Sequence, residues 1–145
     1  MKLGATTIQI TNVHLQPSTV TNQKNLNELS QHLQEMEAIR AKEIAYVQEK
    51  ISTKLPVIVC GDFNSTSSMS APKFLTAKGF TDSFAAVTDK PDEQPTWHWP
   101  VGPLELRLRI DYIFHSPHFQ TRESRILVSA ASDHYLLVSK LKLAK

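Results

Sequence analysis

A short apolar run, Val57-Ile58-Val59-Cys60, is the feature that most restricts the fold of this chain. Pro56 precedes the run and Gly61 follows it, so turn-forming residues bound it on both sides. A run of this length without a polar position is typical of a strand that is buried on both faces, as in sheets covered by other layers. The segment therefore predicts a central strand.

Alternating apolar and polar positions predict further strands on both sides of this run. The predicted strands are Thr7–Leu15, Arg107–Phe114, Ser124–Val128 and Tyr135–Leu143. In the second of these, Leu108, Ile110, Tyr112 and Phe114 share one face. Gln16–Gln23 and Thr88–Pro95 are polar, contain proline and predict loops.

Two helices are expected between the strands. The longer spans about Asn25–Ser52, because apolar residues recur there at helical spacing. These residues are Leu26, Leu29, Leu33, Met36, Ile44, Val47 and Ile51. The shorter spans about Ala71–Lys78, with Ser70 as its N-cap and Gly79 at its end. A strand–helix–strand order followed by a run of strands predicts an α/β (α+β) fold, in which a mixed sheet carries helices on one face.

Composition limits the class of protein. The 145 residues suit one domain, and the formal net charge of +2 is too small to argue for nucleic acid. Cys60 is the only cysteine, so an internal disulfide is impossible. No apolar run is long enough to cross a membrane, and the amino terminus lacks the apolar core of a signal peptide. We therefore expect a cytoplasmic protein.

Polar residues that can carry chemistry occur where three of the predicted strands begin or end. Asp62 and Asn64 directly follow the central strand, and their spacing places them on one side of an extended chain. Asp111 interrupts an apolar and aromatic run, where an unpaired charge would cost several kcal/mol. Asp133 and His134 directly precede the last strand. Such carboxylate and amide groups can orient a water and surround a hydrated cation.

Each group also has a purely structural interpretation. Asp62 and Asn64 could bond the backbone of a local turn. Asp111 could pair with Arg109 or Arg107, and the segment that contains Asp133 could be a polar loop. Taken singly, each structural interpretation is favoured over the catalytic one, but the three groups together, in this order and beside these strands, favour chemistry.

The segments VIVCGDFNS, LRIDYIF and SDHYLLV resemble three successive motifs of the endonuclease/exonuclease/phosphatase (deoxyribonuclease I-like) superfamily. The segment Thr11–Leu15 is similar to the motif that precedes them. The resemblance implies a four-layer α/β sandwich, of which this chain supplies about half. It also implies hydrolysis of phosphodiesters or phosphomonoesters with Mg²⁺ or Mn²⁺, by a phosphodiesterase, nuclease or phosphatase.

The resemblance also implies roles for individual residues. Asp62 and Asn64 correspond to the pair that orients the attacking water and supports the metal, and Asp133 corresponds to a metal ligand. His134 corresponds to the histidine beside the phosphorus, with Asp111 as its carboxylate partner. His14 corresponds to a second histidine that contacts the phosphoryl oxygens.

The chain departs from the family in one respect. Members have an earlier half that supplies a metal-binding glutamate, and no glutamate of this sequence stands in that context. The glutamates of the long helix are expected to lie on its solvated surface; they are Glu35, Glu37, Glu43 and Glu49. Residues 1–145 are therefore expected to form a domain without its amino-terminal part, which leaves open whether the chain is an active enzyme. The alternative is a non-catalytic or partner-dependent half-domain that binds phosphorylated ligands or a protein, or associates as a homodimer.

Several other residues remain ambiguous. The resemblance places Trp97 beside the substrate groove, where it could stack on a base or sugar, but the favoured interpretation is a core-packing Trp97 with Trp99 in a loop. Surface positions are expected for His32, His115 and His118. Nucleic acid, phospholipid and small phosphate esters all remain possible substrates.

Overall fold

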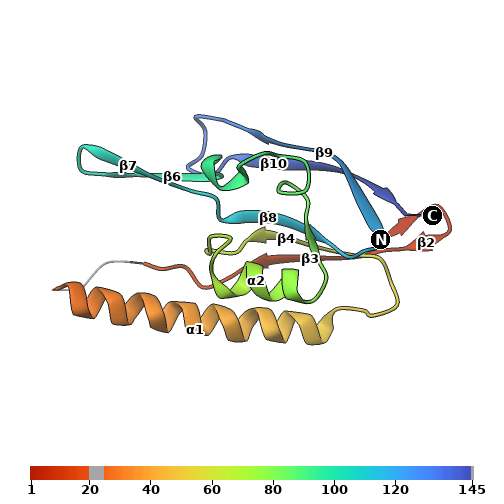
Figure 1. The fold of residues 1–145 in the computed structure, drawn as a ribbon, viewed down its shortest axis with the longest axis horizontal. Coiled ribbons are helices and arrows are strands. Elements are labelled where there is room, and N and C mark those ends of the chain that lie inside the picture. The colour runs from red at the N-terminus through yellow and green to blue at the C-terminus, as the bar shows by residue number, and fades with distance from the viewer. Residues whose placement is uncertain (20–24, 145) are drawn as a thin grey trace.

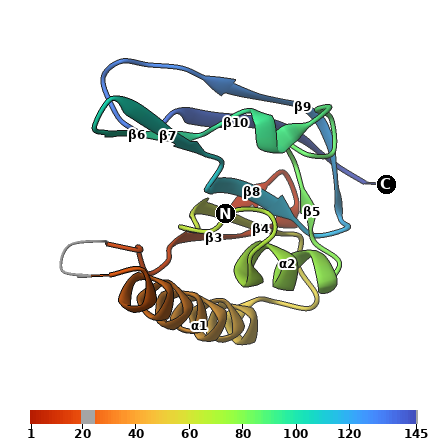
Figure 2. The same cartoon turned by 60° about the vertical axis from the view of Figure 1, so that its left-hand side comes forward.

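The computed structural model describes residues 1–19 and 25–144. Two helices lie on one face of a mixed sheet, and two β-hairpins lie on its other side (Figures 1 and 2). The helices are α1 (Leu26–Lys50) and α2 (Ser70–Ala77). The sheet contains β3 (Gln9–His14), β4 (Val57–Asp62), β5 (Thr81–Asp82) and β8 (Asp111–His115). This arrangement confirms the predicted α/β class and the mixed sheet with helices on one face.

The strand order of the central sheet is β3-β4-β8-β5. The first two strands are parallel and joined by the long α1 crossover, whereas β8 is antiparallel to both of its neighbours. The register pairs His14 with Asp62, and Asp62 with Asp111. Residues directly opposite each other in adjacent strands point to the same side of a sheet. Three polar side chains therefore form a row at one end of the sheet.

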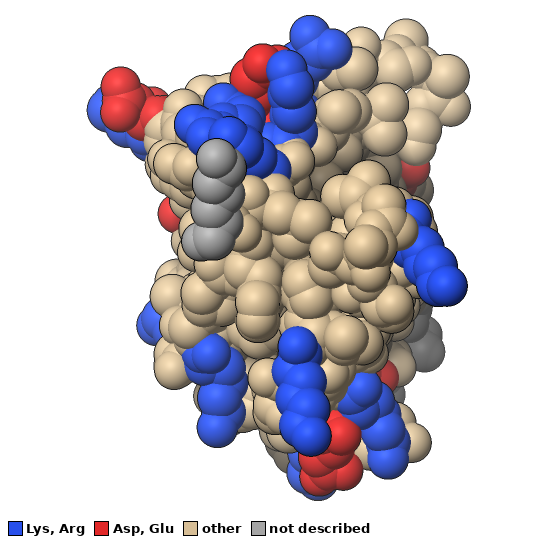
Figure 3. Space-filling view, turned by 90° about the vertical axis from the view of Figure 1, so that its right-hand side faces the viewer, with Lys and Arg blue, Asp and Glu red and all other residues tan. Residues whose placement is uncertain are grey.

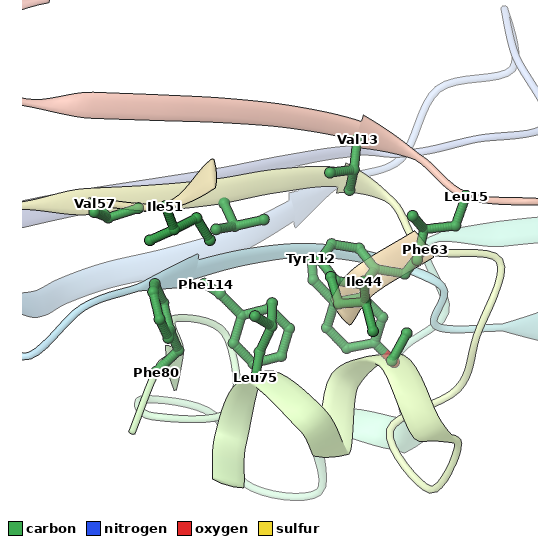
Figure 4. Close-up of a cluster of buried hydrophobic side chains, with 12 residues drawn as sticks. Val13, Leu15, Ile44, Ile51, Val57, Phe63, Leu75, Phe80, Tyr112 and Phe114 are labelled. Carbon is green, nitrogen blue, oxygen red and sulfur yellow. The ribbon is translucent and has the colours of Figure 1, made fainter. Parts of the chain in front are cut away.

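The core lies between the sheet and the helices (Figure 4). Val57 and Val59 of β4 are 1% and 0% exposed there. Phe63 packs edge-on against Tyr112, with ring centroids 5.2 Å apart. On the opposite face of β4, Ile58 and Cys60 are only half-buried. The prediction of a central strand is confirmed, but the strand is completely buried on one face alone.

The second β layer covers part of that opposite face. It contains the hairpin of β9 (Phe119–Leu127) and β10 (Leu136–Leu143). Ser139 of β10 lies over β5, where its hydroxyl is 2.7 Å from that of Ser83. Ile10 of β3, at the other edge of the sheet, remains 46% exposed. The layer thus leaves the β3 side of the sheet open.

Only the carboxyl-terminal half of α1 packs closely on the sheet. Asn25 is the N-cap, and its side chain accepts a hydrogen bond from the backbone N–H of Glu28. Leu26 and Leu33, from the predicted apolar stripe, are 82% and 40% exposed. Ile44 is buried. The apolar stripe therefore packs against the sheet only in the second half of the helix.

An ion pair replaces apolar packing in the middle of α1. Arg40 is 1% exposed and donates to the carbonyl of Gln16, the hydroxyl of Ser18 and the carboxylate of Glu37. Glu37 also accepts from the backbone and hydroxyl of Ser70. The prediction that the helix glutamates form a solvated surface was therefore wrong for Glu37. It was also wrong for Glu43, which accepts from the backbone of Gln16. A buried guanidinium needs such partners. Helical spacing alone could not identify Glu37 as one of them, because it does not show which residues of other segments lie nearby.

The structure corrects the bounds of α2. Met69 is the N-cap and lacks a side-chain capping bond, while Ser70 is the first helical residue and bonds Glu37 instead. Gly79 follows the helix with a φ of 84°, as expected of a glycine that ends a helix.

The predicted strand Arg107–Phe114 is two strands. The first, β7 (Leu104–Leu108), pairs with β6 (Trp97–Val101) in an exposed hairpin, and the second is β8. At the break between them, Arg109 turns inward to Asp82 and Asp92, and Thr96 accepts from the backbone of residues 110 and 111. A buried ion pair thus overrides the alternating pattern.

The remaining elements are short. They are β1 (Lys2–Leu3), β2 (Thr6–Thr7) and the 3₁₀ turn Pro91–Glu93 within the predicted loop. Both termini lie at the end of the sheet opposite the carboxyl end of β4 (Figure 1). Lys and Arg side chains surround that end (Figure 3). Within the described part of the chain, neither helix has the combined length and apolar character that a membrane span requires.

Candidate active site

The site begins with the row formed by His14, Asp62 and Asp111. These residues come from the ends of β3 and β4 and the start of β8, and the sheet register makes them neighbours. Nε2 of His14 lies 3.6 Å from Oδ2 of Asp62. The Asp62 side chain is 16% exposed and that of His14 is 71% exposed. A sheltered carboxylate therefore stands beside an imidazole that solvent can reach.

His134 completes the group from above the row. A backbone bridge to Trp97 holds it at the base of the β6–β7 hairpin. Its Nδ1 lies 3.0 Å from Oδ2 and 3.2 Å from Oδ1 of Asp111. Its Nε2 lies 3.9 Å from Oδ2 of Asp62. Since an ionised carboxylate only accepts hydrogen bonds, the pair with Asp111 places the proton on Nδ1 and turns Nε2 toward Asp62.

Asn64 fixes the orientation of Asp62. The Asn64 backbone donates to Oδ1 of Asp62 at 2.7 Å, and its side-chain amide donates to Oδ2 at 3.0 Å. The same amide donates to the carbonyl of Leu15 at 2.9 Å. Asn64 adopts a φ of 47°, a left-handed conformation that asparagine tolerates better than most residues. The turn interpretation of Asp62 and Asn64 is therefore correct as geometry, and that turn is what aims the carboxylate into the site.

Gly61 allows this turn to lie against β3. Its φ is 131°, and a Cβ there would overlap the carbonyl oxygen of Val13. Only glycine combines this backbone conformation with such a close approach. Gly61 thus allows the ends of β3 and β4, with His14 and Asp62, to lie side by side.

Thr96 holds the backbone at the start of β8 beside Asp111 and was not singled out by the sequence pattern. It is 0% exposed, and its hydroxyl accepts from the backbone of Ile110 and Asp111 at 3.0 Å each. Its carbonyl accepts from the backbone of Tyr135. One threonine therefore ties the strand of Asp111 to the segment of His134. The only sequence signal for Thr96 is its position directly before Trp97, and this signal is too unspecific to predict its role.

Burial dominates the electrostatics of Asp111. It raises the pKa of this carboxyl above its ordinary value, and the neighbouring Asp62 adds to the rise. Hydrogen bonds from Thr96 and His134 oppose the shift, as does the charge of His134. The proposed pairing of Asp111 with Arg109 or Arg107 is wrong, because Arg109 binds Asp82 and Asp92 while Arg107 binds Glu105.

Asp133 stands apart from the other site residues. Its Oδ2 accepts from the indole N–H of Trp97 at 3.1 Å. Although desolvation opposes the change, this hydrogen bond lowers the pKa of Asp133 below its ordinary value. The structure thus turns the carboxylate toward the hairpin, whereas the adjacent His134 points to Asp111. The two neighbours serve different partners, as their adjacency in sequence predicts.

The remaining aromatic and histidine residues differ from expectation in two places. Trp97 is half-buried and stacks parallel to Trp99 with centroids 6.3 Å apart, so neither the core position of Trp97 nor the loop position of Trp99 is correct. His115 is 2% exposed and lies 2.8 Å from the hydroxyl of Thr121, so its predicted surface position is wrong. His118 is exposed as predicted.

The donor set of the site suits a divalent cation. Asp62, Asp111 and His134 each offer one ligand atom, and these atoms lie within 4.8 Å of one another. Carboxylate oxygens are the ligands that Mg²⁺ prefers, and it commonly takes one or two of them while keeping several waters. Asp62 and Asp111, two half-buried carboxylates at one end of the sheet, meet that requirement.

Comparison with known proteins identifies a matching family and several solved structures with the same fold. The sequence model described as the Endonuclease/Exonuclease/phosphatase family matches residues 12–134. No curated protein sequence matches the chain. Among solved structures, a 3′ phosphatase from Neisseria bound to a product DNA hairpin aligns over 92% of this chain with a TM-score of 0.65 and 18% identity. The catalytic domain of human Nocturnin with bound sulfate aligns over 94% with a TM-score of 0.56 and 18% identity.

A third neighbour is a mannosyl-6-phosphatase from Bacteroides thetaiotaomicron, which aligns over 73% of this chain with a TM-score of 0.50 and 24% identity. With sequence identities of 18% to 24%, the similarity to these structures shows the fold alone. The chain spans 60%, 47% and 46% of the lengths of the three neighbours.

Proposed function

Because the chain belongs to the endonuclease/exonuclease/phosphatase family, we propose that it hydrolyses a phosphate ester with the help of a divalent metal ion, Mg²⁺ or Mn²⁺. The observation that carries the proposal is the convergence of His14, Asp62, Asp111 and His134 at one end of the sheet. Two imidazoles flank one carboxylate there, and a second carboxylate orients one of them.

This arrangement suits phosphoryl transfer, which depends on positioning and charge neutralisation more than on covalent chemistry. Asp62, held by Asn64, would orient the attacking water. His134, held by Asp111, would bind a phosphoryl oxygen or pass a proton at its Nε2. His14 would bind a second phosphoryl oxygen from the other side of Asp62.

A bound divalent ion would neutralise the phosphoryl oxygens and acidify a coordinated water. Asp62 and Asn64 are the proposed holders of this ion, with Asp111 and His134 close enough to contribute. Asp133 remains a proposed ligand on the strength of the family resemblance. To take that role its carboxylate would have to exchange Trp97 for the ion.

The titles of two neighbours name phosphatases, one a 3′ phosphatase solved with DNA and one a mannosyl-6-phosphatase. They support phosphate-ester hydrolysis in general. For this chain, the direct test is a panel of phosphodiesters and phosphomonoesters assayed with Mg²⁺ or Mn²⁺ and again with a chelator. Metal-dependent hydrolysis of at least one ester supports the proposal, and metal-independent hydrolysis or none contradicts it.

A partner-dependent half-domain is the second candidate. The observation that favours it is the open β3 side of the sheet, where Ile10 is 46% exposed, together with the turn of Asp133 away from the cluster. A second copy of the chain or a complementing chain would cover that side. Activity that appears only in an assembled form would distinguish this candidate from an enzyme that acts alone.

A further inference from the structure

The β6–β7 hairpin has one completely apolar face. Its register pairs Trp97 with Leu108, Trp99 with Leu106 and Val101 with Leu104. Paired residues and alternate residues along a strand share a face of the hairpin. The apolar face therefore consists of Trp97, Trp99, Val101, Leu104, Leu106 and Leu108. The other face carries His98, Pro100, Glu105 and Arg107.

This apolar face is open to solvent over most of its length. Trp99 is 52% exposed, Val101 is 53% exposed and Leu104 is 74% exposed. The hairpin extends away from the rest of the molecule (Figure 1). A contiguous exposed apolar surface of this kind marks a place where something apolar binds.

The apolar face starts at the candidate active site. The Trp97 ring lies 6.4 Å from that of His134, centroid to centroid, and its N–H donates to Asp133. A strand of five residues extends roughly 16 Å. A group attached to a phosphate beside His134 could therefore lie along the face for several bond lengths.

Charge on the hairpin selects among possible substrates. All of residues 97–108 are described, and Arg107 and His98 both bind the carboxylate of Glu105 on the polar face. The apolar face thus offers no unpaired cation to a nucleic-acid backbone, whose affinity for proteins depends on phosphate contacts. Its length and its aliphatic outer part suit an alkyl chain better than one planar base.

We propose that this face is the alkyl subsite of the enzyme, and that its substrates are phosphate esters that carry an alkyl chain, as lipid phosphates do. The proposal rests on the proposed function for the phosphate end of the substrate. The alkyl chain would run from Trp97 past Trp99 toward Val101 and Leu104. The hairpin residues would select the substrate without contacting the phosphorus.

The protein carries its own probe of this binding. Its 2 tryptophans, Trp97 and Trp99, both lie on the apolar face, so tryptophan emission, excited selectively, reports on the hairpin alone. We expect butyl, octyl and dodecyl phosphate, each below its micelle concentration, to shift the emission to shorter wavelength with rising affinity. Full burial of one methylene corresponds to roughly a fourfold change in affinity, so a one-sided face should give roughly two- to fourfold for each methylene.

Two matched variants locate the effect. Leu104→Glu at the exposed hairpin tip should remove most of the gain in affinity from octyl to dodecyl phosphate. Leu26→Glu changes a leucine that is 82% exposed at the start of α1 and should leave this gain unchanged. An equal loss in both variants would overturn the alkyl subsite, as would affinity that is independent of chain length.

Two further outcomes also overturn the proposal. An emission shift with oligothymidylate but not with dodecyl phosphate would assign the face to nucleobases. A shift that depends on protein concentration alone would assign it to a second copy of the chain. If short esters are hydrolysed but affinity does not depend on chain length, the alkyl subsite is rejected and the proposed function stands. If the emission shift depends on chain length but no ester is hydrolysed, the proposed function is rejected and the alkyl subsite stands.

Discussion

The Nδ1 atom of His134 lies 3.0 Å from Oδ2 of Asp111, although the two residues belong to different β layers. Asp111 starts a strand of the central sheet, whereas His134 precedes a strand of the second layer. This hydrogen bond therefore couples the two layers at the point where the chemistry is proposed to occur.

Replacement of His134 by alanine should lower kcat by roughly 10²- to 10⁴-fold on any ester that the protein hydrolyses, because it removes a group that acts in the transition state. Asp62→Ala should have an effect of similar size. Steady-state kinetics would measure both. The matched control is His118→Ala, an exposed histidine of the same chain that lies outside the site. Unchanged turnover in His134→Ala would reject its assigned role.

Hydrolysis should stop on addition of a chelator and return with Mg²⁺ or Mn²⁺. We also expect weak binding of the metal by the isolated chain, because the described site provides two close carboxylates. Calorimetry with Mn²⁺ would measure the affinity without reference to activity. Asp62→Asn should weaken binding further, whereas Asp89→Asn should not. Tight binding that survives Asp62→Asn would show that the ion is held elsewhere.

Gly61→Ala should unfold or strongly destabilise the protein, by about 3 kcal/mol or more. The added methyl group would meet the carbonyl of Val13, and the φ of 131° is unfavourable for alanine. Gly102→Ala is the matched control, since Gly102 also has a positive φ of 59° but nothing lies within 4 Å of its Cβ position. Its cost should be about 1 kcal/mol. Chemical denaturation would measure both, and equal losses would contradict the steric argument.

Glu37→Gln should lower stability at neutral pH by about 1–3 kcal/mol, the value of hydrogen bonds to a charged group. Although burial opposes it, hydrogen bonds from Ser70 and Arg40 lower the pKa of Glu37 below its ordinary 4.5. A lowered pKa in the folded state stabilises the protein above the unfolded pKa, and the gain disappears as the pH falls through the folded pKa.

The difference between wild type and Glu37→Gln should therefore be largest above pH 4.5 and shrink in more acidic solution. Thermal unfolding between pH 3 and pH 8 would follow it. Glu49→Gln, on the exposed face of the same helix, should show no such trend. A constant difference at all pH values would mean that packing, and not charge, accounts for the loss.

The open side of the sheet predicts association in solution. Ile10 on that side is 46% exposed, and Leu136 and Val128 of the second β layer are 61% and 75% exposed. A stable interface needs about 800 Å² on each partner, and a two-fold dimer is its simplest form. Light scattering at micromolar concentration should detect a dimer. A monodisperse monomer that melts cooperatively would contradict this expectation.

The central strand and the row of His14, Asp62 and Asp111 could be predicted from sequence because their signals are local. The apolar run at Val57 marks the strand, Asp62 and Asp111 stand at strand ends, and His134 lies shortly before β10. The break at Arg109 could not be predicted, because it depends on Asp82 and Asp92, which are distant in sequence. The same holds for Arg40, whose burial requires the loop after His14. Long-range ion pairs leave no periodic pattern.

The register that aligns His14, Asp62 and Asp111 also determines when the proposed site can form as the protein folds. Hairpins and helices join residues that are close in sequence and form quickly, whereas contacts between distant segments form slowly because a long loop must first close. The parallel pairing of β3 with β4 encloses the whole of α1, and His134 comes from still further along the chain. A chain that has gained its helices and hairpins would still lack a site. Recovery of the proposed hydrolysis after denaturation would therefore mark the last tertiary step of folding.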